Sequence, residues 1–158
     1  MTTELKLSGY FTLQEMIASD KAREYHIDNT PPPEIVTNLV NTCRMLDKIR
    51  NHVGCPVTTS SGYRCPKLNA IVGGSINSYH MKGQAGDLNC LALGPPYLFA
   101  KKILELRDLD PTFVFHELIL EGTWVHVAIP LPTERPLFKV GTYKMIGGRK
   151  TWLAGLIK

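Results

Sequence analysis

The segment "FHELILEGTWVHVAIP" (residues 115–130) alternates apolar and polar side chains on both sides of a Gly-Thr pair. Alternation of this kind around two turn residues predicts a β-hairpin. Residues that pair across a hairpin lie on the same face of the sheet. The expected pairs are Glu121 with Trp124, Ile119 with His126, and Glu117 with Ala128. One face of the hairpin therefore carries a histidine and two carboxylates.

The opposite face of this hairpin is apolar. It carries Val125, Val127 and Ile129, which we expect to be core residues. On the polar face, an imidazole is flanked diagonally by the carboxylates of Glu117 and Glu121, which is what a metal ligand beside a general base requires. Strand pairing alone does not distinguish which of the two carboxylates would be the base.

Two helices are predicted upstream of the hairpin. The sequence "TLQE" at 12–15 is a capping box and predicts a helix over about 13–19. A longer helix is expected to begin near Pro32, where Thr30 or a neighbour caps it, and to end at Gly54. Its apolar face, at three- and four-residue spacing, consists of Ile35, Val36, Leu39, Val40, Cys43, Leu46, Ile49 and Val53.

Four shorter elements lie between this helix and the hairpin. We expect strands in "PVTTSSGY" (56–63) and "AGDLNC" (85–90), and helices in "CPKLNAIVGG" (65–74) and "PPYLFAKKILELRD" (95–108). Helices dominate the first third and strands follow later. This order predicts an α+β fold with a small, mostly antiparallel sheet and flanking helices.

Composition places the chain among globular proteins. The 158 residues are 44% hydrophobic and 20% charged, which is enough to build one core and is untypical of disorder. We expect a domain over 1–130 and a basic C-terminal extension over 131–158, packed on that domain. The extension contains six Lys/Arg residues against one acid, Glu134. Such a stretch can bind an anionic polymer, although it is more often a solvated surface.

The cysteines and the N-terminus bear on compartment. The four cysteines contain no C-x-x-C pair, which argues against a zinc knuckle or a thioredoxin-like motif. "MTTELKLSGYFTLQE" does not resemble a signal sequence, and no apolar run is long enough for a membrane span. We therefore expect a chain made in a reducing cytoplasm, with thiols that stay reduced. The cysteines are Cys43, Cys55, Cys65 and Cys90.

A second concentration of polar residues is "SINSYHMKGQAGDLNC" (75–90), where His80 and Asp87 lie seven residues apart among small residues. A catalytic zinc site needs three protein ligands from His, Asp or Glu and an open fourth position. This segment offers two such ligands, and the hairpin offers a third in His126. A single histidine is more often structural, so the case depends on more specific motifs.

Such motifs are present. The stretch "SSGYRCPKLNAIVGGSINSYHMKGQAGDLNC" and the later "LILEGTWVHVAI" resemble the M15 peptidases, which are zinc-dependent D,D-carboxypeptidases and peptidoglycan endopeptidases. The single-domain forms of phages and bacteria are the most similar. The matching motifs are S-G-Y-R at 61–64, N-x-x-V-G-G at 69–74, S-x-H-x-x-G-x-A-x-D at 78–87 and W-V-H-V at 124–127. The resemblance covers about residues 10–130 and implies a hedgehog/D,D-peptidase-like fold.

The resemblance also implies roles for individual residues. His80, Asp87 and His126 match the family's zinc ligands. Arg64 matches the arginine that recognises the substrate or polarises it, a role that suits the rigid fork of a guanidinium. Ser78, two residues before the first ligand, would either hold the loop or contact substrate, and both interpretations stay open.

The general base is where the sequence departs from several branches of the family. These branches have an acid three residues before the last histidine ligand, and here that position is Thr123. The single-domain group usually has its glutamate earlier, in "Q-L-I-x-E", which corresponds to Glu121. We therefore predict Glu121 as the base and keep Glu117 as the alternative. Zinc would activate a water molecule, Glu121 would take its proton, and Arg64 would steady the substrate or the oxyanion.

The function implied is hydrolysis of peptidoglycan stem peptides by a monomeric zinc peptidase. Which bond is cut, D-Ala-D-Ala, L-Ala-D-Glu or a cross-bridge, stays open. Without a signal peptide, the enzyme would reach the cell wall after release, as an endolysin does, or as a virion component. An alternative is a non-catalytic zinc-binding interaction domain, because hedgehog signalling domains have a similar fold. Nucleic acid is not an expected partner, since the basic extension contains no known binding motif.

Overall fold

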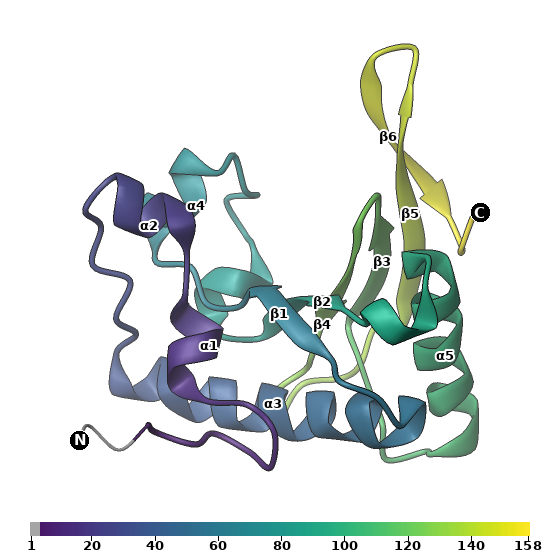
Figure 1. Ribbon diagram of the computed structural model, residues 1–158, viewed down its shortest axis with the longest axis horizontal. Coiled ribbons are helices and arrows are strands. Elements are labelled where there is room, and N and C mark those ends of the chain that lie inside the picture. Colours follow the sequence, from purple (N-terminus) through teal and green to yellow (C-terminus); the bar gives the residue numbers. More distant parts are fainter. Residues whose placement is uncertain (1–3) are drawn as a thin grey trace.

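The protein is described from a computed structural model that covers residues 4–158 (Figure 1). It has an α+β fold, as predicted, with five α-helices and a six-stranded, mostly antiparallel mixed sheet in the described chain. The helices are α1 (Leu13–Ile17), α2 (Asp20–Glu24), α3 (Pro33–Val53), α4 (Pro66–Ile71) and α5 (Pro96–Leu109), with 3-10 turns η1 (Tyr79–Lys82) and η2 (Leu91–Leu93). The strands are β1 (Thr58–Ser61), β2 (Ala85–Asn89), β3 (Glu117–Glu121), β4 (Trp124–Ala128), β5 (Lys139–Ile146) and β6 (Arg149–Ala154).

Helix α3 has the apolar face that its residue spacing predicts. Leu39, Cys43, Leu46 and Ile49 are fully buried, and the helix ends at Gly54, which adopts a left-handed conformation (φ 68°). The expected side-chain cap at Thr30 is wrong. The N-cap is a proline without a capping side chain, because prolines in the first turn have no N–H group that needs an acceptor.

The N-terminal helix is shorter than predicted. Its capping box is present, with Thr12 and Glu15 bonded reciprocally, but α1 ends at Ile17. Two residues later the side chain of Ser19 accepts a hydrogen bond from the backbone of Ala22 and starts a separate helix, α2, which the sequence analysis missed. Five residues are too few to show a helical periodicity.

The strands lie in the order β1-β2-β4-β3-β5-β6. The register of the β3–β4 hairpin is as predicted, with Glu121 opposite Trp124, Ile119 opposite His126 and Glu117 opposite Ala128. Its apolar face is fully buried at Val125, Val127 and Ile129 and belongs to the same core cluster as the buried faces of α3 and α5. The opposite face of the sheet is thereby left for polar side chains.

Residues beyond 130 extend the sheet. Strand β5 runs parallel to β3, and β6 returns antiparallel to β5. The indole of Trp152 lies against the backbone of Gly141, where a Cβ atom would be 1.9 Å from the ring. In Figure 1 the tip of this hairpin projects away from the rest of the chain. Within residues 4–158, no helix is both long and apolar enough to cross a membrane.

Candidate metal centre

His80 is presented by a tight turn, η1. The hydroxyl of Ser78 accepts a hydrogen bond from the backbone N–H of His80 (3.2 Å), so Ser78 holds the turn, one of the two roles left open by the sequence. The turn closes at Gly83, which is left-handed (φ 66°). A Cβ atom on Gly83 would lie 2.9 Å from the carbonyl of Ile35 in α3, so only glycine fits here without a shift.

The ring of His80 is almost fully buried and its orientation is set by one backbone group. Its Nδ1 lies 2.6 Å from the carbonyl oxygen of Gly62, to which the N–H donates. The Nε2 atom is then the unprotonated nitrogen and faces the interior of the site. Gly62 is itself fixed against α1, because a Cβ atom there would lie 2.3 Å from the carbonyl oxygen of Met16.

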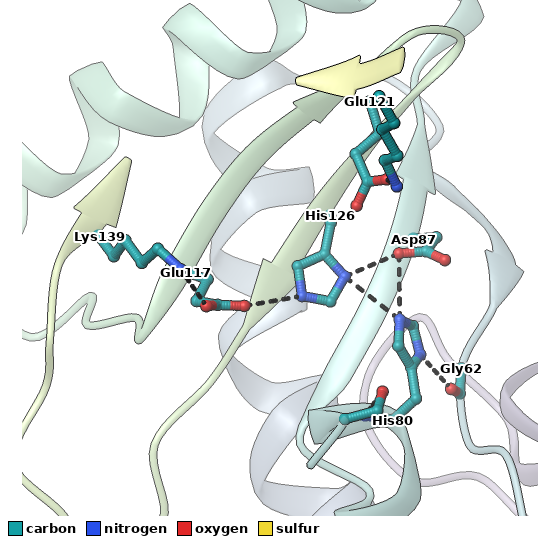
Figure 2. Close-up of polar contacts among 9 residues, drawn as sticks. Gly62, His80, Asp87, Glu117, Glu121, His126 and Lys139 are labelled. Carbon is teal, nitrogen blue, oxygen red and sulfur yellow. Dashed lines mark hydrogen bonds and ion pairs between the residues drawn. The ribbon is translucent and has the colours of Figure 1, made fainter. Parts of the chain in front are cut away.

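Asp87 and His126 come from neighbouring strands. They are direct partners in the β2–β4 ladder, so their side chains share the polar face of the sheet. The Oδ1 atom of Asp87 lies 2.9 Å from Nδ1 of His126 and 3.2 Å from Nε2 of His80 (Figure 2). The two ring nitrogens are 3.2 Å apart. All three side chains are buried, and the structure thus brings together the three residues that the sequence suggested as ligands.

These three donors fit a metal ion. Ligands at about 2.0–2.1 Å from a tetrahedral zinc are about 3.3 Å from one another. The observed separations of 2.9–3.2 Å come close to that triangle. In addition, the outer nitrogen of each imidazole faces an oxygen acceptor, the Gly62 carbonyl for His80 and the Glu117 carboxylate for His126. Acceptors in these positions are usual behind metal-ligating histidines, because they fix the tautomer and the ring orientation.

The charges of the cluster are strongly coupled. Burial lowers the pKa of His80 from its ordinary value, which favours the neutral imidazole that a metal requires. Burial would raise the pKa of Asp87, but hydrogen bonds from His126 and His80 outweigh it and hold this pKa below the usual range. Burial would likewise lower the pKa of His126, yet Asp87 and Glu117 raise it to about 9. Metal binding at neutral pH would therefore release a proton from His126.

Glu117 lies behind the ring of His126. One of its oxygens is 3.5 Å from Nε2 of His126 and the other is 3.1 Å from Nζ of Lys139 on β5. The contact with His126, together with Lys139, lowers the pKa of Glu117 against the effect of burial. The expected surface pair between His116 and Glu117 is wrong. His116 contacts Glu134 instead (3.2 Å), because it precedes the strand and belongs to the other side of the pleat.

Glu121 lies nearer the hairpin turn on the same face of the sheet. Figure 2 shows its carboxylate at the top of the view, on the side of Asp87 and His126 that is away from His80. Its side chain is only 15% exposed, and Oε2 is 2.8 Å from Nζ of Lys150 on β6. The sequence analysis did not anticipate Lys150, because no local pattern relates residues 121 and 150.

Arg64 completes the group of residues that the sequence singled out. Its backbone N–H donates to the carbonyl of His80 (3.2 Å), which ties it to the turn that carries this ligand. Burial lowers the pKa of Arg64, while the charges of Asp87 and Glu121 act in the opposite direction. Among the described residues the buried Nε atom has no hydrogen-bond partner. Arg64 therefore has donor capacity to offer to a bound molecule.

Comparison with known proteins agrees with this geometry. The family model described as Peptidase M15 matches residues 9–108, well over half of the chain. The matched region includes Arg64, His80 and Asp87, whereas His126 and both candidate bases follow it. A search of curated proteins finds no match.

Proposed function

Because the chain belongs to the M15 peptidase family, we propose that it is a zinc-dependent peptidase that cleaves peptide bonds in peptidoglycan stem peptides. The observation that carries this proposal is the buried triangle of donors from His80, Asp87 and His126, no edge of which exceeds 3.2 Å. The choice of peptidoglycan as the substrate is supported by the resemblance of the motifs at 61–87 and 124–127 to those of wall-degrading members.

In this proposal the chain provides three ligands and two groups that orient them. The carbonyl of Gly62 holds His80, and the carboxylate of Glu117 holds His126. When bound, zinc supplies Lewis-acid activation of water at neutral pH. Because the ligands include only one carboxylate, the site keeps a net positive charge that favours a polarised carbonyl group.

Glu121 is the proposed general base. It accepts a proton from the attacking water and returns it to the leaving amine. Glu117 is less suited to this work, because its two oxygens already face His126 and Lys139. Glu121 has one contact of this kind, with Lys150, whose side chain is 58% exposed and can exchange its partner.

Arg64 and Ser78 are the proposed substrate contacts. The unpartnered Nε of Arg64 can donate to the carboxylate of a terminal residue or to a developing oxyanion. A carboxylate partner suits a D,D-carboxypeptidase, and an oxyanion partner suits an endopeptidase as well. We further propose that the enzyme acts as a monomer on the cell wall, after release from the cell or as a virion component, as phage endolysins do.

A non-catalytic zinc-binding domain of the same fold is the second candidate. The observation that favours it is Thr123, which stands where several branches of the family have their acid. In that case Glu121 and Lys150 would form only a surface ion pair.

Digestion of purified muropeptides tests the proposal. The zinc-loaded protein is incubated with monomeric and cross-linked muropeptides, and the products are weighed by mass spectrometry. Loss of a terminal D-alanine identifies a carboxypeptidase, and a cut within the stem or bridge identifies an endopeptidase. His126→Ala serves as the inactive control. A protein that carries one zinc per chain and turns over none of these substrates would support the interaction domain instead.

A further inference from the structure

Two cysteines meet at the β1–β2 edge of the sheet. Cys55 follows the end of α3 and Cys90 follows the end of β2, and their sulfur atoms are 3.0 Å apart. Cys55 is partly exposed, whereas Cys90 is 5% exposed. The two thiols are therefore in direct contact, and one of them can be reached from solvent.

The strand ladder imposes this proximity. Strands β1 and β2 are antiparallel, and their outermost pair is Thr58 with Asn89. The chain immediately before β1 and the chain immediately after β2 must then continue side by side, which brings Cys55 next to Cys90. Pro56, which follows Cys55, restricts the backbone at this point. The contact consequently results from backbone pairing and not from the rotamer of one side chain.

We propose that Cys55 and Cys90 form a reversible disulfide by exchange with a low-molecular-weight disulfide such as oxidised glutathione. The thiolate of Cys55 attacks one sulfur of oxidised glutathione, and the first glutathione leaves as its thiolate. Cys90 then loses its proton and attacks the sulfur of Cys55, and the second glutathione leaves. Two protein thiols are oxidised to one disulfide, and one oxidised glutathione is reduced to two molecules of glutathione.

The order of these steps follows from access and acidity. Cys55 is the more exposed sulfur, so the external disulfide reaches it first. Burial, together with the hydrogen bond to Cys55, raises the pKa of Cys90 to about 11. Closure by Cys90 is therefore the step that becomes faster as the pH rises from 7 to 9, because only its thiolate attacks.

The other two cysteines are not placed for this chemistry. Cys43 is fully buried in the core face of α3, and burial raises the pKa of its thiol. Cys65 caps α4, and its backbone N–H donates to Oδ1 of Asn29 (2.8 Å). In the described part of the chain neither has a sulfur contact, so both provide internal controls.

The disulfide would close the loop that contains Arg64, His80 and Asp87. Closing a loop between residues 55 and 90 restricts the unfolded chain and favours the folded one. We expect the melting temperature of the metal-free protein to rise by roughly 5–15 °C on oxidation. This inference concerns the fold of the loop and does not rest on the proposed peptidase activity.

Tryptic mapping tests the proposal on the unmodified chain, because each cysteine lies in its own peptide. The peptides are 24–44 for Cys43, 51–64 for Cys55, 65–67 for Cys65 and 83–101 for Cys90. The folded protein is incubated with oxidised glutathione, the remaining thiols are alkylated, and the digest is analysed by mass spectrometry. We expect a cross-link between 51–64 and 83–101, a loss of about 2 Da from the intact protein, and reversal by a reducing agent.

Variants separate the two steps. Cys90→Ser should stop at the mixed disulfide of Cys55 with glutathione, and Cys65→Ser should form the cross-link as the unmodified chain does. The proposal is overturned if the unmodified chain accumulates glutathione on Cys55 without forming the cross-link. It is equally overturned if the cross-link joins Cys65 to another cysteine, or if oxidation leaves the melting temperature unchanged.

Discussion

The two halves of the candidate site are held in different ways. In the segment 61–87, which carries Arg64, His80 and Asp87, backbone and side chains pack so closely that there is little room for change. A Cβ atom on Gly62 would lie 2.3 Å from a carbonyl oxygen of α1. One on Gly74 would lie 2.1 Å from the side-chain oxygen of Asn69. Contacts this short force the chain to shift.

In the second half, strands β3 to β6, the polar side chains are placed by register and adjusted by lysines. Glu117 contacts Lys139, and Glu121 contacts Lys150, and both lysines are about half exposed. Exposed ion pairs of this kind contribute about 0–1 kcal/mol. The comparison suggests that the first half sets whether a metal binds, whereas the second half sets how well the bound site works.

The largest expected effect is loss of the metal. His80→Ala removes a ligand whose two ring nitrogens both have partners, so the variant should contain no zinc by metal analysis. The protein should stay folded by circular dichroism, because the core cluster of α3 and α5 does not depend on the site. His52→Ala, outside the site, should keep its zinc. Full zinc in His80→Ala would mean that the ligand assignment is wrong.

The next effect is on catalysis alone. Glu121→Gln should keep zinc and fold but lose about 10²–10⁴-fold in kcat on a muropeptide substrate, because the amide cannot accept the proton. Full activity in this variant, combined with a large loss in Glu117→Gln, would exchange the roles of the two carboxylates.

A smaller effect is expected from Glu117→Gln. The amide oxygen can still accept a hydrogen bond from His126 but without the charge, so zinc affinity should fall by about tenfold in competition with a chelator. With zinc in excess, kcat should stay within a few-fold of the original. A loss of kcat that excess zinc does not restore would contradict a purely orienting role.

The smallest effect is expected from the lysine on β6. Lys150→Met removes the partner of Glu121 and should lower kcat a few-fold without changing zinc content, and Lys150→Arg should restore most of the loss. Lys144→Met is the matched control, because Lys144 lies on the same hairpin and contacts the C-terminal residue Lys158 instead. Equal effects of Lys144→Met and Lys150→Met would show that the hairpin matters only for stability.

Much of the site could be predicted because its signals are local. The β3–β4 register follows from period-two alternation around two turn residues, which places Glu117, Glu121 and His126 on one face. The motif around His80 and Asp87 is likewise contained in a short segment. Strands β5 and β6 were missed because most of their residues are only half-buried or exposed, so no hydrophobic alternation marks them.

By itself, the sequence determined the helix α3, the hairpin and the identity of the three donor residues, since each depends on neighbours within one element or one motif. Only the tertiary structure decided what surrounds them. The parallel pairing of β5 with β3 brings Lys139 to Glu117, and β6 brings Lys150 to Glu121. These contacts join residues more than twenty positions apart through a sheet that must close first, and no local preference of the chain encodes such a pairing.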